Sequence, residues 1–381
     1  MLKEISLYIH IPFCLGKCYY CDFPSFCHID DETKNRYITI LIKELESWKE
    51  KLPDYQLKSV FMGGGTPTVL PNHEMDRILN ALFSGFRLKN DLEFSIEGNP
   101  GTVNKEKLAF YHSSGINRLS IGLQAWQDSL LKKIGRIHNR DTFIKNYYMA
   151  REIGFQNINI DLMFSLPDQT MGQWMETLKE VTALSPDHIS AYSLKIEETT
   201  PFYQAVLEDR LKLPSEDIDR DMYHWTIDFL KSLGYEHYEI SNFAKEGKSC
   251  IHNVVYWNND EYIGIGLGAH SSFRRTRFSN TLDINDYIEG MKEKNSAEID
   301  RVVISVEDEM AETMFLGLRL LNGICMDRFE KRFGKDLLFM YRRQITDLIE
   351  KGLLETDGKR IRLTRKGIDL SNQVFIAFLP E

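Results

Sequence analysis

Three cysteines lie within eight residues near the start of the chain, at Cys14, Cys18 and Cys21. Pro12 and Gly16 favour a loop in this segment, so the three thiolates can converge on one inorganic centre. An iron–sulfur cubane normally takes four cysteines. Three would leave one iron open to a substrate or a cofactor. The spacing therefore predicts a [4Fe–4S] cluster with one open coordination site.

A zinc site is the alternative for the same loop. Structural zinc is usually tetrahedral and needs four protein ligands. Cys27 or His28 could supply the fourth, so a zinc-stabilised structural or regulatory protein stays open at this point. Six cysteines in a chain without a visible export signal point to thiols or metal ligands rather than disulfides. We therefore expect a reducing, cytoplasmic environment.

The elements that must position the cysteine loop alternate between strand and helix. Apolar residues fall at every second position in 5–11, which predicts a strand, and at helical spacing in 33–52. Further predicted strands are 59–62, 92–96, 118–123, 157–162, 188–194 and 236–240, and further predicted helices are 74–83, 105–113, 142–153, 172–184 and 217–233. This alternation predicts a parallel α/β sheet that closes fully or partly into a barrel, with function at the C-terminal ends of the strands.

The pattern changes near residue 300. Helices are predicted at 307–321, 327–333 and 337–351, and two short strands at 354–356 and 360–363 flank the turn Asp357-Gly358. Helices followed by a hairpin resemble a small winged-helix module. We therefore expect a barrel in 1–240, a connecting segment in 241–300 and a winged-helix-like domain in 301–381.

Composition narrows the classes of function. The chain has 43% hydrophobic and 27% charged residues, the balance of an ordinary globular protein. The net charge of −9 disfavours a nucleic-acid partner, which would need a basic face. No stretch of eighteen apolar residues predicts a membrane-spanning helix. Gly264–Ala269 looks like a dinucleotide fingerprint but lacks the spacing of the third glycine, so we expect a close-packed turn there. We expect Cys325 to be a small buried hydrophobe.

The CxxxCxxC motif after a first strand resembles the signature of the radical S-adenosylmethionine (SAM) enzymes. In that superfamily the amino and carboxylate groups of SAM complete the coordination of the fourth iron. The β/α alternation is similar to the superfamily's partial TIM-like barrel, a three-quarter (β6/α6) form. Tyr20 occupies the aromatic position that lies beside the adenine, and Gly63–Pro67 resembles the glycine motif that holds the SAM amino group.

Most of residues 5–270 are similar to the oxygen-independent coproporphyrinogen oxidase family. Polar residues at the ends of successive predicted strands carry this resemblance, and together they outline the mouth of a pocket. The resemblance implies SAM contacts at Tyr8, Tyr20, Gly64, Gly65, Thr66, Glu97, Gln124, Arg136 and Asp161. Lys195 aligns with a further contact position, although its residue type departs from the family's.

Two departures from the oxidase weaken the expectation of decarboxylase activity. The oxidase motif continues with a fourth cysteine, CxxxCxxCxC, where this chain has Phe23. The oxidase also carries an N-terminal extension toward its active site, and only thirteen residues precede Cys14 here.

The segment His252-Asn253-Val254-Val255-Tyr256-Trp257 combines an imidazole with two aromatic side chains that could stack on a macrocycle. On the residues alone it could equally be a packed loop with a satisfied histidine. It is similar, however, to the HNxxYW motif of the HemW-type heme chaperones, which bind heme and pass it to acceptor hemoproteins. The resemblance implies that His252 is an axial heme ligand. Cys250, two residues earlier, could also approach heme.

The leading hypothesis is a cytoplasmic heme chaperone on a radical SAM barrel that binds a [4Fe–4S] cluster, SAM and heme. The alternative is an oxygen-independent coproporphyrinogen III oxidase, which would cleave SAM reductively and abstract hydrogen from a porphyrinogen propionate. The resemblance implies acceptor hemoproteins such as membrane-bound respiratory cytochromes. A transient peripheral membrane encounter and a homodimer are further expectations.

Overall fold

The computed structural model describes residues 2–380. Its strands are β1 (Lys3–Ile11), β2 (Phe13–Cys14), β3 (Phe26–Cys27), β4 (Tyr55–Gly64), β5 (Leu88–Gly98), β6 (Arg118–Gln124), β7 (Ile158–Phe164), β8 (His188–Ser193), β9 (Glu236–Glu239), β10 (Asn242–Ala244), β11 (Tyr262–Ile265), β12 (His270–Phe273), β13 (Thr276–Asn280), β14 (Glu298–Val303), β15 (Ile324–Cys325), β16 (Leu354–Thr356) and β17 (Arg360–Leu363).

Its helices are α1 (Asp31–Lys51), α2 (Asn72–Gly85), α3 (Lys105–Ser113), α4 (Asp128–Lys133), α5 (Arg140–Ile153), α6 (Met171–Ala183), α7 (Pro201–Leu207), α8 (Glu216–Ser232), α9 (Ile251–Trp257), α10 (Ile284–Glu293), α11 (Val306–Gly317), α12 (Met326–Phe333), α13 (Leu337–Met340), α14 (Arg342–Glu350), α15 (Arg365–Asp369) and α16 (Ser371–Ile376).

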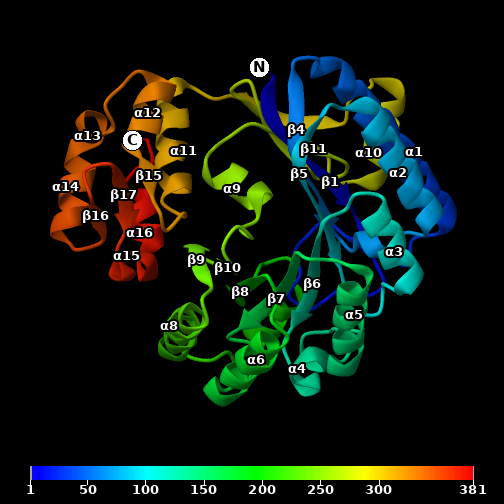
Figure 1. Ribbon diagram of the computed structural model, residues 1–381, viewed down its shortest axis with the longest axis horizontal. Helices are drawn as coiled ribbons and strands as arrows, with labels where there is room; N and C mark the ends of the chain where they lie inside the picture. The colour runs from blue at the N-terminus through cyan, green and yellow to red at the C-terminus, as the bar shows by residue number, and fades with distance from the viewer. Residues whose placement is uncertain (1, 381) are drawn as a thin grey trace.

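Six parallel strands follow one another in the sheet in the order of the chain, β1-β4-β5-β6-β7-β8. Figure 1 shows this sheet curving around one side of the molecule, with α1 to α6 on its outer face. The crossover helices and the curvature confirm the predicted partial α/β barrel. The helices pack on the sheet through a continuous apolar core, because each carries its hydrophobic residues on one face.

The sheet continues beyond the predicted barrel on both sides. β11 lies parallel beside β1 and is followed by the antiparallel strands β12, β13 and β14. On the other side β10 and β9 are antiparallel to their neighbours, so the predicted strand at 236–240 does not extend the parallel set. Gly264 lies within β11, where a Cβ would come within 2.2 Å of the His270 carbonyl oxygen. Residues 241–300 therefore supply sheet strands, while the division at residues 240 and 300 stays a prediction.

Side chains of the barrel strands alternate between the helices outside and the barrel interior, which we call the lumen. On β6, Leu119, Ile121 and Leu123 pack in the apolar core. Arg118 and Ser120, at the intervening positions, line a cavity in the lumen. The same alternation on neighbouring strands gives the lumen its polar residues.

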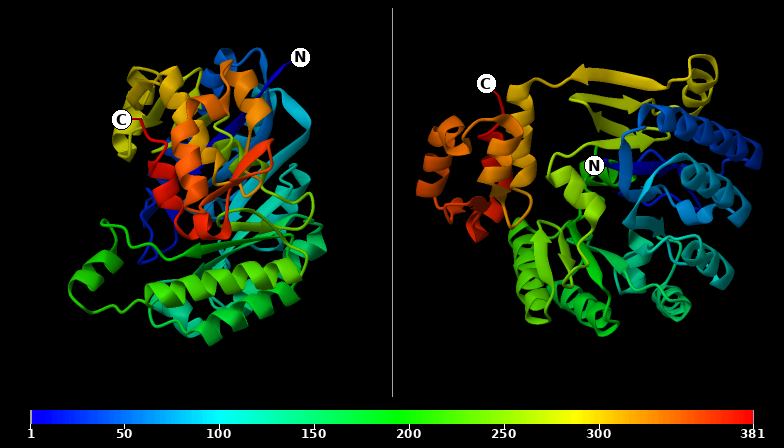
Figure 2. Two further views of the ribbon diagram at one scale, coloured as in Figure 1. Left: turned by 90° about the vertical axis from the view of Figure 1, so that its left-hand side faces the viewer. Right: turned by 45° about the horizontal axis from the view of Figure 1, so that its top comes forward.

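A second apolar core lies in the C-terminal part of the chain, built from α11, α12, α14 and the three-stranded sheet β15-β17-β16. Helices followed by the β16–β17 hairpin fit the predicted winged-helix-like arrangement. Figure 2 shows this region set against one side of the barrel. Ion pairs join the two parts, among them Arg365 with Asp228 and Arg277 with Glu312. Within residues 2–380 no helix is long and apolar enough to cross a membrane.

Candidate functional site

The three predicted cluster ligands lie on the loop between β1 and α1, at the C-terminal end of the first barrel strand. Cys14 belongs to the short strand β2, which pairs with β3 so that Cys14 and Cys27 are direct neighbours. Cys18 and Cys21 lie in a turn closed by a hydrogen bond from the Cys21 N–H to the Cys18 carbonyl. All three thiols are free and partly exposed. The loop therefore brings the three predicted sulfur donors to one end of the barrel.

The three thiols lie close enough together to affect one another's ionisation, and a positively charged side chain lies beside them. Burial first, and then the nearby Cys18 and Cys14, raise the pKa of Cys21 to about 11. Nη1 of Arg136 lies 3.4 Å from the Cys18 sulfur. Cysteines must lose their protons to bind a metal, and the positive charge of the metal then offsets the repulsion between the thiolates. The donor set of three cysteines thus fits an iron–sulfur cluster.

The same donors are not grouped as a mononuclear metal site. Across residues 2–380, no three His, Cys, Asp or Glu side chains are arranged to hold a single metal ion. Cys27 and His28, the proposed extra zinc ligands, lie on and just after β3. The zinc alternative therefore gains no support from the arrangement of the described side chains.

The glycine loop at the end of β4, Gly63–Pro67, packs against the chain that leads into the cysteine loop. A Cβ on Gly64, whose φ is +101°, would come within 2.2 Å of the His10 ring. A Cβ on Gly65 would come within 2.7 Å of the Ile11 carbonyl oxygen. The N–H groups of Gly65 and Thr66 donate to the carbonyls of Ile11 and Phe13, at 2.9 and 2.8 Å. These N–H groups fix the two loops together, so they are not free to bind a ligand.

Two carboxyl groups face the lumen from β5 and β7. The Glu97 carboxylate accepts from the Gly64 N–H at 3.2 Å. Burial, and then the nearby charge of Asp161, raise the pKa of Glu97 to about 8. Asp161 accepts from Ser120 and from Asn159, both at 2.8 Å. At neutral pH Glu97 is therefore largely protonated and can donate as well as accept.

Arg136 and Gln124 lie close to the cluster loop. Nη2 of Arg136 donates to Asn99 and to the Gly122 carbonyl. A side chain at Gly122 would collide with both Asn99 and Arg136, which explains the glycine. Gln124 follows a register shift at the end of β6 and has a φ of +73°. A non-glycine residue in this strained region is common at ligand sites.

Tyr20 and Thr66 complete the predicted set around the cysteines. Burial raises the pKa of Tyr20, and the nearby Arg136 opposes that rise. Oγ1 of Thr66 accepts from Asn99 at 2.8 Å and lies 3.6 Å from the Cys14 sulfur. By contrast, Lys195 is 80% exposed and pairs with Glu197. The structure thus gathers the predicted cysteine, glycine and strand-end residues, and it leaves Lys195 outside.

A cavity of about 520 Å³ occupies the lumen. Most of its lining is aromatic or polar, and it reaches Phe23, the residue that replaces the fourth cysteine of the oxidase motif. Among the predicted site residues, it is lined by Tyr8, Gly64, Glu97, Asp161 and His252. The volume lies in the usual range of small-molecule sites, about 300–1,000 Å³. Four of the nine predicted SAM contacts therefore line the same cavity as the predicted heme ligand.

His252 is on the helix α9, which Figure 1 shows between the curved sheet and the C-terminal helices. Its side chain is 1% exposed. Nδ1 lies 3.0 Å from the Ser59 hydroxyl, and Nε2 lies 2.9 Å from the Tyr256 hydroxyl. Ser59 donates its own proton to Ser6, so it accepts from Nδ1–H, and Nε2 then accepts from Tyr256. Burial lowers the pKa of His252 to about 3, so the ring is neutral.

The N-terminus of α9 is held by a residue that the sequence did not single out. Glu93 on β5 accepts from the N–H groups of Ile251 and His252, both at 3.0 Å, and from the Cys250 thiol at 3.5 Å. Cys250 is fully buried, and its pKa is raised to about 12, chiefly by burial. The thiol points to Glu93 rather than to an open site. No local motif marks Glu93, because its role depends on pairing β5 with a helix more than 150 residues later.

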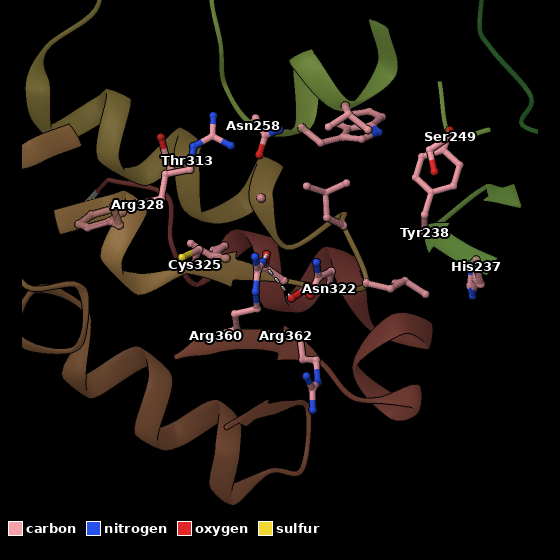
Figure 3. A pocket seen from close by; sticks show the side chains of 18 of the residues that line it. His237, Tyr238, Ser249, Asn258, Thr313, Asn322, Cys325, Arg328, Arg360 and Arg362 are labelled. Atoms are coloured by element: carbon pink, nitrogen blue, oxygen red, sulfur yellow. Dashed lines mark hydrogen bonds between the residues drawn. The ribbon is translucent and has the colours of Figure 1, made fainter. Parts of the chain in front are cut away.

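A second cavity, of about 750 Å³, lies on the other face of α9. Figure 3 shows Arg328 on α12, Arg360 and Arg362 on β17, and Cys325 on β15 among the residues that line it. Trp257, the last residue of the HNxxYW motif, also lines this cleft. The expectation that Cys325 is a small buried hydrophobe is wrong, because its side chain is partly exposed and lines this cleft. None of the predicted site residues lines the cleft.

Comparisons with known proteins agree with this geometry. The family model of the radical SAM superfamily matches residues 8–181, and the family model of the HemN C-terminal domain matches residues 304–370. The chain is 38% identical to the heme chaperone HemW of Bacillus subtilis, covering 99% of each chain. It is 32% identical to the heme chaperone HemW of Escherichia coli, covering 100% of this chain and 99% of that one.

Among solved structures, coproporphyrinogen III oxidase (HemN) from Escherichia coli shares the fold, with a TM-score of 0.87 and 25% identity. The match covers 99% of this chain and 90% of the oxidase. The barrel and the C-terminal region thus both have counterparts in that enzyme. The full-length similarity to curated relatives places the chain more narrowly: it belongs to the HemW family of the radical SAM superfamily.

Proposed function

We propose that this protein is a heme chaperone, which binds heme and transfers it to acceptor hemoproteins. The observation that carries the proposal is helix α9, which puts a neutral imidazole on the wall of an aromatic-lined cavity in the lumen. Neutral imidazole is the form that binds iron. Tyr8, Phe61 and Tyr262 offer aromatic surface to a macrocycle in the same cavity.

We propose that Cys14, Cys18 and Cys21 hold the [4Fe–4S] cluster. The predicted SAM contacts are Tyr8, Tyr20, Gly64, Gly65, Thr66, Glu97, Gln124, Arg136 and Asp161. When bound, the cluster would offer SAM one open iron and could supply an electron. The chain's own residues orient the ligand: Arg136 fixes the turn at Cys18, and Gly65 lets the two loops approach closely. The protonated Glu97 offers a hydrogen-bond donor to the ligand.

His252 is the proposed axial heme ligand. Ser59 accepts from Nδ1–H and fixes the tautomer that leaves the lone pair of Nε2 directed at Tyr256. A hydrogen bond to the nitrogen that does not bind metal is the usual way in which proteins orient a histidine ligand. Iron binding at Nε2 requires the Tyr256 hydroxyl to move away. Tyr256 is therefore proposed as a cap on the ligand atom.

The second candidate is an oxygen-independent coproporphyrinogen III oxidase. The full-length likeness to the Escherichia coli oxidase favours it. Phe23 opposes it, because it is 58% exposed at the cavity where the oxidase motif has its fourth cysteine. The family's chaperone members support the first candidate over the second.

We further propose a cytoplasmic protein whose acceptors are hemoproteins such as membrane-bound respiratory cytochromes. Exchange with such acceptors needs only a transient membrane encounter. A homodimer and the three-part division at residues 240 and 300 are also proposed. Cross-linking of the reconstituted chain with and without heme tests the dimer.

The test of function uses anaerobically reconstituted full-length protein. Heme is titrated and followed by its absorption spectrum, and coproporphyrinogen decarboxylation is assayed in the same preparation. Stoichiometric heme binding, followed by transfer to a heme-free acceptor hemoprotein without decarboxylation, supports the chaperone. Formation of protoporphyrinogen with turnover would instead establish the oxidase.

A further inference from the structure

Arg118 is a buried guanidinium that the proposed site does not use. It is 2% exposed, and it lines the lumen cavity. Its Nε has no hydrogen-bond partner within residues 2–380. No salt bridge from Arg118 to a carboxylate forms there either. Buried charges are ordinarily paired, so a guanidinium left open toward a cavity needs a separate explanation.

Nearby acidic groups do not provide that pairing. Glu93 and Asp161 lie close enough for their charges to act on Arg118, together with Cys250 and Tyr238. The Glu93 carboxylate, however, already accepts from the first turn of α9 and from Cys250. Asp161 already accepts from Ser120 and Asn159. Arg118 thus lines the cavity with its Nε–H unpaired, and its guanidinium is placed to bind a group that enters the cavity.

The position of Arg118 separates it from the cluster. Arg118 is the first residue of β6, while Gln124, beside the cysteine loop, is the last. A parallel strand rises about 3.3 Å per residue, which puts the two strand ends about 20 Å apart. Helix α9 lies near the Arg118 end of the lumen. His252 on this helix contacts Ser59, which lies before the C-terminal half of β4, and the charge of Arg118 lowers the pKa of His252. Arg118 therefore shares the end of the lumen where His252 lies.

We propose that Arg118 anchors a carboxylate of the ligand in the lumen, and that this carboxylate is a heme propionate when His252 binds the iron. The planar fork of a guanidinium matches a carboxylate and binds it through two parallel hydrogen bonds. Heme presents two propionates at one edge of its ring. The inference rests on the proposed heme chaperone function, and it adds the group that would fix the orientation of the macrocycle.

SAM also carries a carboxylate, so the test must separate the two sources. The full-length, anaerobically reconstituted protein is titrated with heme and with heme dimethyl ester, in which both propionates are masked. The wild-type protein should bind heme at least about tenfold more tightly than the ester, as expected for hydrogen bonds to a charged group. Equal affinities would overturn the inference without any variant.

The variant Arg118→Gln should bind heme about as weakly as the wild-type protein binds the ester, and its affinity for the ester should not change. Arg118→Lys should restore part of the preference for heme. The matched control is Arg151→Gln, since Arg151 is paired with Asp187 outside the cavity. It should keep the full preference.

Three outcomes overturn the inference in distinguishable ways. A full preference for heme over the ester in Arg118→Gln would show that Arg118 does not contact the propionates. If Arg118→Gln binds SAM more weakly than the wild-type protein but binds heme equally well, the carboxylate that Arg118 contacts belongs to SAM instead. If wild-type protein binds neither heme nor its ester, the proposed function itself fails.

Discussion

The hydroxyl of Tyr256 donates to Nε2 of His252 at 2.9 Å, one turn earlier on α9. The spacing of the HNxxY segment produces this bond, because residues four apart lie on the same face of a helix. The tyrosine thereby covers the atom that would bind iron. The two nitrogens of the imidazole therefore differ: Nδ1 is held by Ser59, and Nε2 is covered by Tyr256.

Removal of the cap should strengthen heme binding. In Tyr256→Phe the lone pair of Nε2 no longer accepts a hydrogen bond, which is worth about 1 kcal/mol net, or roughly fivefold in affinity. Heme titration of the reconstituted variant measures the change. Tyr262→Phe is the control, since Tyr262 lines the same cavity without bonding to His252. A weaker titration for Tyr256→Phe than for the control would contradict the role of Tyr256 as a cap.

Glu93 should stabilise the fold through α9. In Glu93→Gln one oxygen becomes an NH₂ group that faces backbone N–H donors, which should lower the free energy of unfolding by about 1–3 kcal/mol. Urea unfolding measures the loss. Glu289→Gln, at an exposed position on α10, should leave the stability unchanged. Equal unfolding curves for both variants would show that α9 does not depend on Glu93.

Glu97 should make the stability depend on pH. Its pKa is about 8 in the folded protein, against an ordinary value of 4.5. Between these values the unfolded chain releases a proton that the folded chain keeps, so this group lowers stability as pH rises from about 4.5 to about 8. Glu97→Gln removes the effect.

The melting temperatures of Glu97→Gln and the wild-type protein, compared at pH 5 and pH 8, check this prediction. The glutamine variant should gain stability relative to the wild type at the higher pH. A difference that is the same at both pH values would mean that Glu97 is already ionised in the folded protein.

Cys18 should be required for the cluster. Cys18→Ser removes one of three sulfur ligands, so the broad visible absorbance of reconstituted protein and its bound iron and sulfide should be lost. Cys325→Ser is the matched control, because Cys325 lies in the C-terminal cleft. Retention of the full absorbance by Cys18→Ser would remove this cysteine from the ligand set.

The periodicity of the sequence was enough to predict the six parallel strands, because each crossover unit leaves a local alternation of strand and helix. β11 was not predicted. Its four residues, Tyr262–Ile265, contain a glycine and follow only the short helix α9, and the strand pairs with its neighbour β1 in the sheet. Short strands of this kind depend on tertiary pairing rather than local preference.

The cysteine loop and the strand-end residues can be singled out from the sequence because their motifs are local, and their roles in binding stay predictions. The partners of His252 were not. Ser59 and Glu93 are distant in sequence, and only the lumen brings them to α9. Arg118 gave no signal either, since a lone arginine at the start of a strand usually lies at the surface.

The most direct test is one anaerobic preparation, reconstituted with iron and sulfide, in which heme binding and coproporphyrinogen decarboxylation are measured together. Heme chaperone function predicts about one heme bound per chain, heme transfer to a heme-free acceptor, and no protoporphyrinogen. Turnover of coproporphyrinogen, or failure to bind heme in protein with a full cluster, would contradict it.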